Sequence, residues 1–470
     1  MNLNTTRKMQ VREPGSFRDP SGYIFAENGK LYRQVSLEYR EDFDYFIGSG
    51  LHNELVARGL LNPHTEMEAG VFDIPGAYKI LCPRVVEFIS YPYEWCFSQL
   101  KDAALVTLEI EKLALDYGMT LKDSSAYNIQ FVEGKPLLID TLSFRHYVEG
   151  KPWVAYRQFC QHFLAPLALM TLKDVRLGQL LRNNIDGVPL DLTSRLLPQF
   201  KSFRTGLLLH LHLHALTQRR YADRPVNDNI ASRKFSKRSF YGLIESLHDS
   251  VERLHWEKGS NGWRDYYTKS EIDSRYLEHK RTLVADYVEQ VKPSSAWDIG
   301  SNTGMFSRIV AQKGIPVVSF DSDTGCVEEN YLKTKRNKET NILPLLADFT
   351  DPSPALGWEN KERKSILDRG PVDIAMALAL IHHLAIGNNL PMVKIASFFQ
   401  KICKWLIIEF VPKSDPMVKK LLRVREDIFY RYKQEDFESD FGQFFHIKER
   451  QQIGESQRSL YLLKSKDTVK

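Results

Sequence analysis

The sequence has few cysteines and no long apolar run. The first feature argues against a disulfide-stabilised protein, and the second argues against an integral membrane protein. The 470 residues contain only five cysteines, which are scattered and form no CxxC pair. No disulfide framework is therefore expected, and a reducing cytoplasm is the simplest location. The first residues, MNLNTTRKMQVREPGSF, lack the apolar core of a secretory signal. No unbroken apolar run of about 18 residues is present, so we expect no integral membrane segment.

The chain also lacks a strong charge of either sign. Its 64 Lys and Arg against 59 Asp and Glu give a formal net charge of only +5. A nucleic-acid-binding protein normally concentrates basic charge on one domain or face, so we expect no nucleic-acid partner. With 43% hydrophobic and 11% aromatic residues, the chain can bury cores of substantial size. Its length suits two or three domains.

The least core-like stretch, Gln218 to Ser239, divides the chain. It is polar, contains Pro225, and carries seven Lys and Arg residues against two Asp residues. Such a composition is typical of a linker or a surface crossing. Its charge fits a solvated surface, and contact with an anionic ligand or lipid surface is the alternative. We predict a first domain over 1–217 with a tail at 1–20, a basic linker with a connecting helix over 218–262, and a second domain over 263–470.

Short apolar runs alternate with helical patterns in the second domain. SAWDIG, PVVSFD and LPLLAD fit strands, and helical spacing lies between them. This alternation is typical of parallel βαβ units. The end differs, because FFHIKER and RSLYLLKS flank a polar turn and predict an antiparallel hairpin. We therefore predict an α/β fold with a Rossmann-like sheet.

The stretch WDIGSNTGMF, from Trp297 to Phe306, follows the first of these strands. Glycines in such a turn let backbone N–H groups approach a nucleotide. A dinucleotide site needs G-x-G-x-x-G, but here Asp298, Gly300 and Gly304 leave the middle glycine missing. A pyrophosphate would also lie badly against Asp298. A ligand with an amine and a sulfonium, such as S-adenosylmethionine, would be favoured by that carboxylate.

Two later strands end in acidic residues at the positions that this ligand requires. Asp321 follows VVSF, 23 residues after Asp298, close to the spacing of about 20 expected for an acidic ribose anchor. Asp348 follows LLA, where an acceptor would meet the adenine amino group. Phe349 lies beside it and can pack on the adenine ring.

These features together resemble the class I S-adenosylmethionine-dependent methyltransferases, over roughly Trp263 to Ser465. That family has a seven-stranded sheet whose last strand is antiparallel, which fits the hairpin predicted above. The resemblance implies that Asp321 holds the ribose and that Asp348 and Phe349 hold the adenine. It implies that the methionine part lies against the glycine-rich loop, at Asp298, Gly300, Asn302 and Gly304.

Three residues near strand ends are candidates for catalysis. His382 and His383 end DIAMALALIHHL, where a substrate would meet the methyl group. Either can act as a general base, because an unperturbed imidazole is largely neutral near pH 7, or can only shape the pocket floor. Glu409 ends a later strand at the same edge and either faces the acceptor or pairs with Lys413. No metal site is predicted, because HLHLH has no carboxylate nearby to complete a ligand set.

The motifs DPSPALGW, ALALIHHLAI and IIEFVPKSDP resemble a bacterial subfamily that includes the host-specific nodulation protein NoeA. The similarity extends over most of the chain. It implies methylation of oxygen or nitrogen on a small-molecule or glycan acceptor, in a cell-surface or signalling-glycan pathway. The alternatives are a bifunctional kinase–methyltransferase that modifies glycan ends and a non-enzymatic scaffold that binds S-adenosylmethionine.

A second pattern lies in the first domain, within LKDSSAYNIQFVEGKPLLIDTLSF. Asp123 and Asn128 are five residues apart, and Asp140 follows twelve residues later. Kinases use this arrangement to orient a hydroxyl and to hold magnesium. The domain thus resembles a kinase-like or aminoglycoside-phosphotransferase-like fold, which would bind Mg-ATP. It departs from the pattern because Lys122 precedes the first Asp, because DTL replaces DFG, and because no glycine-rich loop is visible.

These departures leave three alternatives open: an active kinase, a non-catalytic kinase-like module that positions substrate, and coincidence. Two converging carboxylates repel each other unless a cation, a lysine or water relieves them. We therefore predict either a magnesium site or a buried basic partner, with Arg33 as the first candidate. Lys122 should point away from the cleft.

Overall fold

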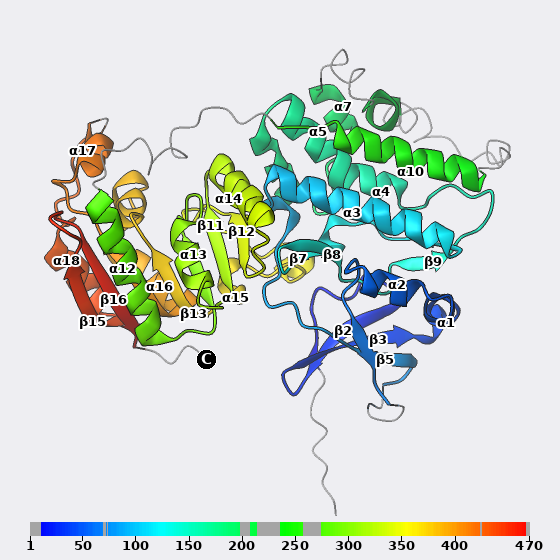
Figure 1. Cartoon of the computed structure of the whole chain (residues 1–470), viewed down its shortest axis with the longest axis horizontal. Coiled ribbons are helices and arrows are strands. Elements are labelled where there is room, and N and C mark those ends of the chain that lie inside the picture. The colour runs from blue at the N-terminus through cyan, green and yellow to red at the C-terminus, as the bar shows by residue number, and fades with distance from the viewer. Residues whose placement is uncertain are drawn as a thin grey trace, which may run out of the picture. The chain divides into compact units, whose positions relative to one another are not determined.

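The computed structural model describes residues 11–68, 72, 74–197, 207–213, 236–256, 274–423 and 425–466. The chain divides into two compact units, and Figure 1 shows the elements of each. The first unit comprises Met1–Glu257 with Leu356–Arg363, and the second comprises Lys258–Ala355 with Lys364–Lys470. Within the described ranges, no helix combines the length and the apolar content that a membrane crossing requires.

The first unit begins with a five-stranded antiparallel sheet in the order β1-β2-β3-β5-β4. Asn28 and Gly29, both at positive φ, form the tight turn between β2 and β3. Helices α1 and α2 follow β3, and Phe43 of α1 packs on Val35 and Leu81 of the sheet. The elements are β1 (Val11–Arg12), β2 (Gly22–Glu27), β3 (Lys30–Ser36), α1 (Arg40–Gly48), α2 (Leu51–Ala57), β4 (His64–Glu66) and β5 (Ala77–Pro83).

The rest of the first unit is mainly helical and is organised around α3 (Phe97–Asp116). This 20-residue helix buries an apolar face, and the chain turns at Gly118, which has a φ of 76°. Two short antiparallel strand pairs follow: β7 pairs with β8, and β6 pairs with β9. Asp123 and Asp140 lie in the loops between these strands. The strands and α-helices that follow α3 up to residue 197 are β6 (Met119–Leu121), β7 (Ile129–Val132), β8 (Lys135–Leu138), β9 (Phe144–His146), α4 (Tyr156–Phe159), α5 (Ala165–Leu172), α6 (Leu180–Asn183) and α7 (Leu190–Leu196).

Two parts of the first unit differ from the sequence-based expectation. Helix α10 (Lys237–Glu252) lies within the stretch expected as linker and connecting helix, but it packs on α3 as part of this unit. Its apolar residues recur at helical spacing and are buried, which explains this packing; they are Phe240, Ile244, Leu247 and Val251. Strand β1 lies within the expected tail and pairs with β2. Residues 218–235 of the expected linker lie outside the described residues.

The segment Leu356–Arg363 belongs to the first unit although its neighbours along the chain belong to the second. Arg18 donates two hydrogen bonds to the buried carboxylate of Glu362, at 2.9 and 2.7 Å. The guanidinium of Arg363 lies 4.2 Å from the ring centroid of Tyr127. These contacts give the end of the motif DPSPALGW and the residues after it a structural role.

The second unit is built on a seven-stranded sheet in the order β12-β11-β10-β13-β14-β16-β15. The first five strands of this order are parallel, whereas β16 runs antiparallel to both β14 and β15. The predicted α/β class and the closing antiparallel hairpin are confirmed. The strands are β10 (Ala296–Ile299), β11 (Val317–Asp321), β12 (Ile342–Leu346), β13 (Val372–Ala377), β14 (Cys403–Phe410), β15 (Phe445–Gln452) and β16 (Ser459–Ser465).

Strand order reverses beside β10, which pairs with β11 on one side and with β13 on the other. Ligands of open α/β sheets bind at the carboxyl ends of the strands at such a switch point. The helices of this unit are α12 (Ser274–Val291), α13 (Met305–Ala311), α14 (Thr324–Asn337), α15 (Ile366–Arg369), α16 (Met392–Ile402), α17 (Pro416–Leu422) and α18 (Gln434–Gly442). Val284, Tyr287 and Val288 of α12 join the core under β10 and β13. Helical spacing in the sequence predicts that this first helix begins at Glu271, and residues 271–273 lie outside the described residues.

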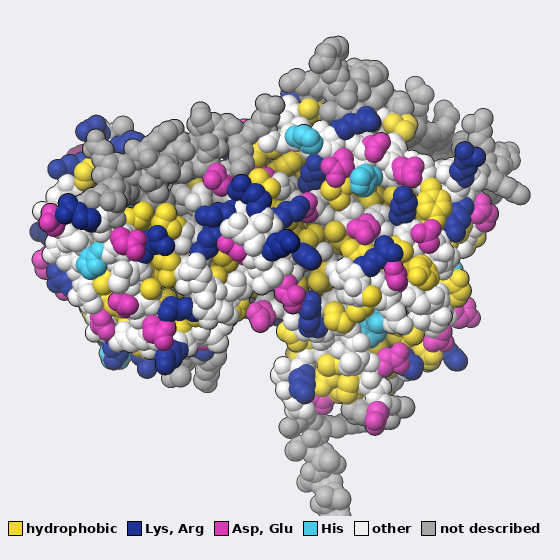
Figure 2. Space-filling model, in the orientation of Figure 1, with side chains coloured by type: hydrophobic (Ala, Val, Ile, Leu, Met, Phe, Trp, Pro, Cys, Tyr) yellow, Lys and Arg dark blue, Asp and Glu magenta, His cyan; other side chains and the backbone are white. Residues whose placement is uncertain are grey.

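Acidic and basic side chains are interspersed over the face drawn in Figure 2, with basic side chains gathered most densely near α14. The last turn of α14 carries Lys335 and Arg336. Basic residues at the carboxyl end of a helix are stabilised by the helix dipole. These two residues therefore need no anionic partner to explain their position.

Candidate active site

The loop between β10 and α13 has an unusual backbone. Gly300, Asn302 and Gly304 all have positive φ, at 78°, 51° and 74°. Glycine adopts this region without strain, and asparagine is among the residues that tolerate it best. The side chain of Asn302 also accepts a hydrogen bond from the N–H of Thr303, at 2.8 Å. The residue types of this loop thus follow from its tight curvature beside the carboxyl end of β10.

Asp321 is the last residue of β11 and lies beside this loop. One carboxylate oxygen accepts the N–H of Asn302 at 2.7 Å, and the other accepts the N–H of Asp323 at 2.8 Å. Burial raises the pKa of Asp321 to about 6, although these N–H groups favour its charged form. Each oxygen of a carboxylate has a second lone pair, so both can still accept a ligand hydroxyl.

Asp348 and Phe349 follow β12 and lie on the other side of Asp321. Oδ1 of Asp348 accepts two hydrogen bonds from Thr350, from its N–H at 2.8 Å and its hydroxyl at 2.7 Å. The ring of Phe349 packs edge-on against Phe320 and Phe398, with centroids 5.4 and 6.1 Å apart. The turn and the aromatic cluster hold both side chains in place.

A cavity of about 280 Å³ lies at the carboxyl ends of these strands. Its volume is near the lower end of the range of roughly 300–1,000 Å³ for ligand pockets. Six predicted site residues line it: Gly300, Asn302, Asp321, Asp348, Phe349 and His383. Sequence reasoning missed other lining residues, including Ser322, Asp323, Ala379, Leu380 and Asn388. All but Asn388 directly follow a strand or its first turn, so a search of every position after β11 and β13 would have found them.

Asp298 and Gly304 do not line the cavity, which differs from the direct ligand contact that we expected. Asp298 is 1% exposed and accepts a hydrogen bond from the hydroxyl of Ser307 at 2.6 Å. Burial raises its pKa to about 6. A Cβ on Gly304 would lie 2.4 Å from Oδ1 of Asn330 and 2.6 Å from Nη1 of Arg308. Both residues instead pack against segments behind the loop, Asp298 through Ser307 and Gly304 through Asn330 and Arg308.

His382 and His383 are adjacent in sequence but differ in access. His383 lines the cavity, whereas His382 is 1% exposed and does not. Burial lowers the pKa of His383, and it lowers the pKa of His382 much further, with a smaller effect of the neighbouring imidazole. A neutral imidazole can accept a proton, so His383 is the better placed of the two to act as a base.

Glu409 neither faces the cavity nor pairs with Lys413, which corrects both alternatives considered from the sequence. It is 0% exposed and accepts hydrogen bonds from Lys280 and Arg458, at 2.5 and 3.1 Å. Burial alone would raise its pKa, but Lys280 and Arg458 outweigh burial and hold it at about 2. Lys413 instead binds Asp427 at 2.6 Å. The partners of Glu409 are distant in the sequence, so spacing gave no sign of them.

The polar side chains predicted to converge in the first unit are linked to one another, and Arg33 lies beside them. Arg33 makes an ion pair with Asp140 at 2.6 Å, and both side chains are 12% exposed. Ser143 donates to Asp140 at 2.6 Å and accepts from Asn128 at 3.3 Å, and Asn128 hydrogen-bonds to Asp123. Burial raises the pKa of Asp123, and the charge of Asp140 raises it further. The predicted basic partner is therefore confirmed.

Lys122 contacts neither Asp123 nor Asp140, but it shares Asp19 with Arg33, whose guanidinium lies 4.0 Å from that carboxylate. The ammonium of Lys122 lies 4.6 Å from the ring centroid of Tyr39 and 3.4 Å from Asp19, and it also hydrogen-bonds to Ser21. Among the described residues, no group of three or more His, Cys, Asp and Glu side chains is arranged to share a metal ion. Arg33 thus supplies the positive charge beside Asp140.

Replacing Arg33 by alanine is expected to create a response to magnesium. The variant leaves Asp140 and Asp123 close together without their cation, which should lower the free energy of unfolding by about 1–3 kcal/mol. Magnesium should recover part of this loss in the variant and add nothing to the wild type. Thermal unfolding with and without MgCl₂ measures both effects.

The matched control is Arg40→Ala, which removes an arginine from an exposed ion pair with Asp44. Exposed pairs contribute little, so this variant should unfold like the wild type. An equal magnesium response in wild type and Arg33→Ala would show that Arg33 does not take the place of a cation.

Comparison with known proteins gives a family for the whole chain. The chain is 32% identical to nodulation protein NoeA of Rhizobium meliloti (strain 1021) over 456 residues. The aligned part covers 96% of this chain and 95% of that protein. The chain belongs to the NoeA family. No family model matches it.

Solved structures show weaker similarity to parts of this NoeA-family chain. The bifunctional kinase-methyltransferase WbdD is 15% identical, with a TM-score of 0.30, over 44% of this chain and 42% of that chain. The N-methyltransferase NodS from Bradyrhizobium japonicum WM9 is 14% identical, with a TM-score of 0.30, over 42% of this chain and 99% of that chain. The sheet order and the cavity of the second unit agree with the methyltransferase-like fold expected from the sequence.

Proposed function

We propose that this protein transfers a methyl group from S-adenosylmethionine to an oxygen or nitrogen of a glycan or small acceptor. The single observation that carries the proposal is the cavity at the switch point of the sheet. It combines the positive-φ loop at Gly300, the carboxylate of Asp321, and Asp348 beside Phe349. In that order along the strand ends, these groups suit the amino-acid, ribose and adenine parts of the cofactor.

The side chains in the cavity divide the ligand between them. Asp321 accepts hydrogen bonds from the two ribose hydroxyls, and Phe349 packs on the adenine beside the carboxylate of Asp348. The backbone at Gly300 contacts the methionine part, because a glycine allows the closest approach. When bound, the cofactor supplies a methyl group already activated by its sulfonium. The protein then has to hold the acceptor in line at about 3–3.5 Å, and His383 can take its proton.

The glycan acceptor rests on the family rather than on the cavity. The relative is named a nodulation protein, and the resemblance of the sequence motifs implies cell-surface or nodulation-signal biosynthesis. The test is to incubate the protein with methyl-labelled S-adenosylmethionine and fractionated cell-surface glycans. Label should enter one fraction with the wild type and none with Gly300→Val. Binding of the cofactor without labelling of any glycan or small acceptor would favour the scaffold alternative.

For the first unit we propose a non-catalytic role in positioning the acceptor. The ion pair of Arg33 with Asp140 supports this role, because a kinase needs that carboxylate to hold magnesium. The convergence of Asp123, Asn128 and Asp140 keeps a bifunctional kinase–methyltransferase as the second candidate. Calorimetric titration with Mg-ATP decides between them, since only the kinase should bind it in a magnesium-dependent way.

Affinity for S-adenosylhomocysteine should rise as pH increases through about 6. Asp321 has a pKa of about 6 in the folded chain against an ordinary 3.8, so its carboxyl group is largely protonated in more acidic solution. Only the ionised form accepts hydrogen bonds from both ribose hydroxyls. Stability shows the opposite trend: the native state holds the proton more tightly, so this group lowers stability as pH rises from about 4 to about 6.

Calorimetry across this pH range tests the prediction, with Asp321→Asn as the matched variant. The slope of affinity against pH should be smaller in that variant, because residue 321 no longer ionises. An affinity that does not change between mildly acidic and neutral pH would contradict the role of Asp321.

A further inference from the structure

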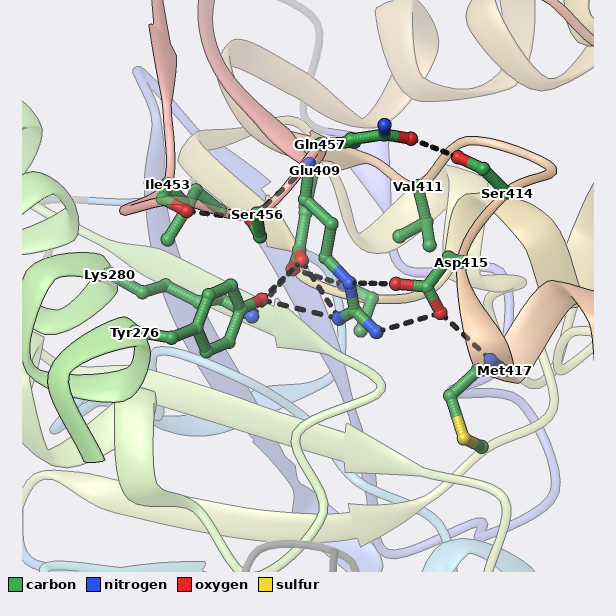
Figure 3. Close-up of polar contacts among 12 residues, drawn as sticks. Tyr276, Lys280, Glu409, Val411, Ser414, Asp415, Met417, Ile453, Ser456 and Gln457 are labelled. Atoms are coloured by element: carbon green, nitrogen blue, oxygen red, sulfur yellow. Dashed lines mark hydrogen bonds and ion pairs between the residues drawn. The ribbon is translucent and has the colours of Figure 1, made fainter. Parts of the chain in front are cut away.

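Behind the cavity lies a buried group of four polar side chains, which we call the Glu409 cluster: Tyr276, Lys280, Glu409 and Arg458. Figure 3 shows Tyr276 and Lys280 reaching from one helix toward Glu409. Oε1 of Glu409 accepts from the hydroxyl of Tyr276 at 2.7 Å and from Arg458 at 3.1 Å, and Oε2 accepts from Lys280 at 2.5 Å. Helix α12, strand β14 and the residue before β16 thus meet at one carboxylate.

Burying the charged groups of this cluster costs free energy, so the cluster is a poor source of stability. Glu409 and Lys280 are almost completely buried, and burial lowers the pKa of Lys280. Replacing a buried ion pair with apolar residues of similar volume is often neutral or stabilising, so such a pair is weak evidence for a purely structural role. Stability alone therefore does not explain why the cluster is present. A further contact of Glu409, with the cavity wall, suggests another role.

The fourth donor to Glu409 is a backbone group of the cavity wall. The N–H of Ala379 donates to Oε2 at 2.9 Å. Ala379 has a φ of 52°, in the left-handed region that non-glycine residues rarely adopt. Such a conformation persists only where the surrounding structure holds it. Leu378, Ala379 and Leu380 all line the cavity.

The conformation of Ala379 sets the position of two site elements. The side chain of Leu380 packs against the glycine-rich loop, with its Cδ1 3.3 Å from where a Cβ of Gly300 would lie. The carbonyl of Leu380 accepts the N–H of His383 at 2.9 Å and so begins the turn that carries this histidine. A change at Ala379 would therefore move both the methionine side of the cavity and His383.

We propose that Glu409 is a positioning residue for methyl transfer, which holds the strained turn at Ala379 through its fixed carboxylate. Tyr276, Lys280 and Arg458 keep that carboxylate ionised and immobile. The proposal rests on the proposed function, since it concerns the same cavity. Under this proposal α12, whose residues do not line the cavity, affects cofactor affinity indirectly, because its Tyr276 and Lys280 hold Glu409.

Glu409→Gln tests the proposal with S-adenosylhomocysteine as the calorimetric probe. The amide is a weaker and less firmly held acceptor for Ala379, so affinity should fall about tenfold, which corresponds to the lower range of left-handed backbone strain. The matched control is Asp440→Asn. Asp440 is a buried carboxylate of α18 that pairs with Arg431 at 3.2 Å and contacts neither Glu409 nor any of its partners. This variant should destabilise the unit while leaving affinity within about twofold of wild type.

A rescue separates positioning from simple destabilisation. Glycine adopts the conformation of residue 379 without strain, so Ala379→Gly added to Glu409→Gln should restore most of the lost affinity. A merely structural role of Glu409 predicts no such recovery. If Glu409→Gln does not fold, Tyr276→Phe removes one donor from the same carboxylate and should reduce affinity in the same direction by a smaller factor.

The outcomes distinguish the two proposals. A wild type that binds no S-adenosylhomocysteine would overturn the proposed function, and this inference with it. A wild type that binds, with unchanged affinity in Glu409→Gln or with a loss that Ala379→Gly does not repair, would overturn the positioning role alone.

Discussion

Gly300→Val is expected to abolish binding of S-adenosylmethionine, with affinity reduced by more than about 100-fold. Gly300 has a φ of 78° and lines the cavity, and a Cβ there would lie 3.3 Å from Leu380. The branched valine side chain must therefore enter the space where the methionine part of the ligand lies. Calorimetric titration of the variant, with thermal unfolding to establish that it is folded, measures the effect.

Gly314→Val is the matched control for backbone strain. Gly314 has nearly the same φ, 79°, and no atom lies within 4 Å of a Cβ placed on it. Both variants thus carry the cost of a left-handed valine, but only Gly300→Val reaches the cavity. Equal affinity in the two variants would show that the loop at Gly300 is not the binding site.

Asp321→Ala should weaken cofactor binding by about 1.5–3 kcal/mol, because it removes charged hydrogen bonds to both ribose hydroxyls. Part of this loss comes from the protein itself, since Asp321 also accepts the N–H groups of Asn302 and Asp323. The loop at Asn302 then loses one of its anchors. Titration with S-adenosylhomocysteine gives the affinity directly.

Asp373→Ala is the control for removing a carboxylate from the same sheet. Asp373 lies near the amino end of β13, away from the cavity, where it binds Ser294 and Lys404. Its removal should leave affinity unchanged. If Asp321→Ala bound the ligand as tightly as Asp373→Ala does, another residue would have to be the ribose anchor.

The fold of the second unit could be predicted from the sequence because the same local pattern, an apolar run followed by helical spacing, recurs along it. Each strand was an apolar run bounded by turn residues, and the antiparallel hairpin was set apart by a polar turn. The first unit was harder to predict. Helix α10 was expected within the linker, because its amphipathic pattern follows a polar, basic stretch. Its partner, α3, lies far away in the sequence, so no local signal showed the packing.

Position at or beyond the end of a strand predicted which residues reach the cavity better than residue type did. Asp321 is the last residue of β11, Asp348 and Phe349 follow β12, and all three line the cavity. Asp298 and Glu409 still lie within their strands, and each is enclosed by partners from other segments. Gly304 matched the motif but serves to make room for Asn330 and Arg308. A motif gives residue types and spacing, but side-chain direction depends on distant packing.

Titration of S-adenosylmethionine into the wild-type chain tests the central claim most directly. The account predicts saturable binding at one site per chain that Gly300→Val abolishes and Gly314→Val retains. ATP shares the adenine and ribose but has a triphosphate in place of the methionine part, so it should not compete. The absence of saturable binding, or full competition by ATP, would contradict a methyl-donor site at the carboxyl edge of this sheet.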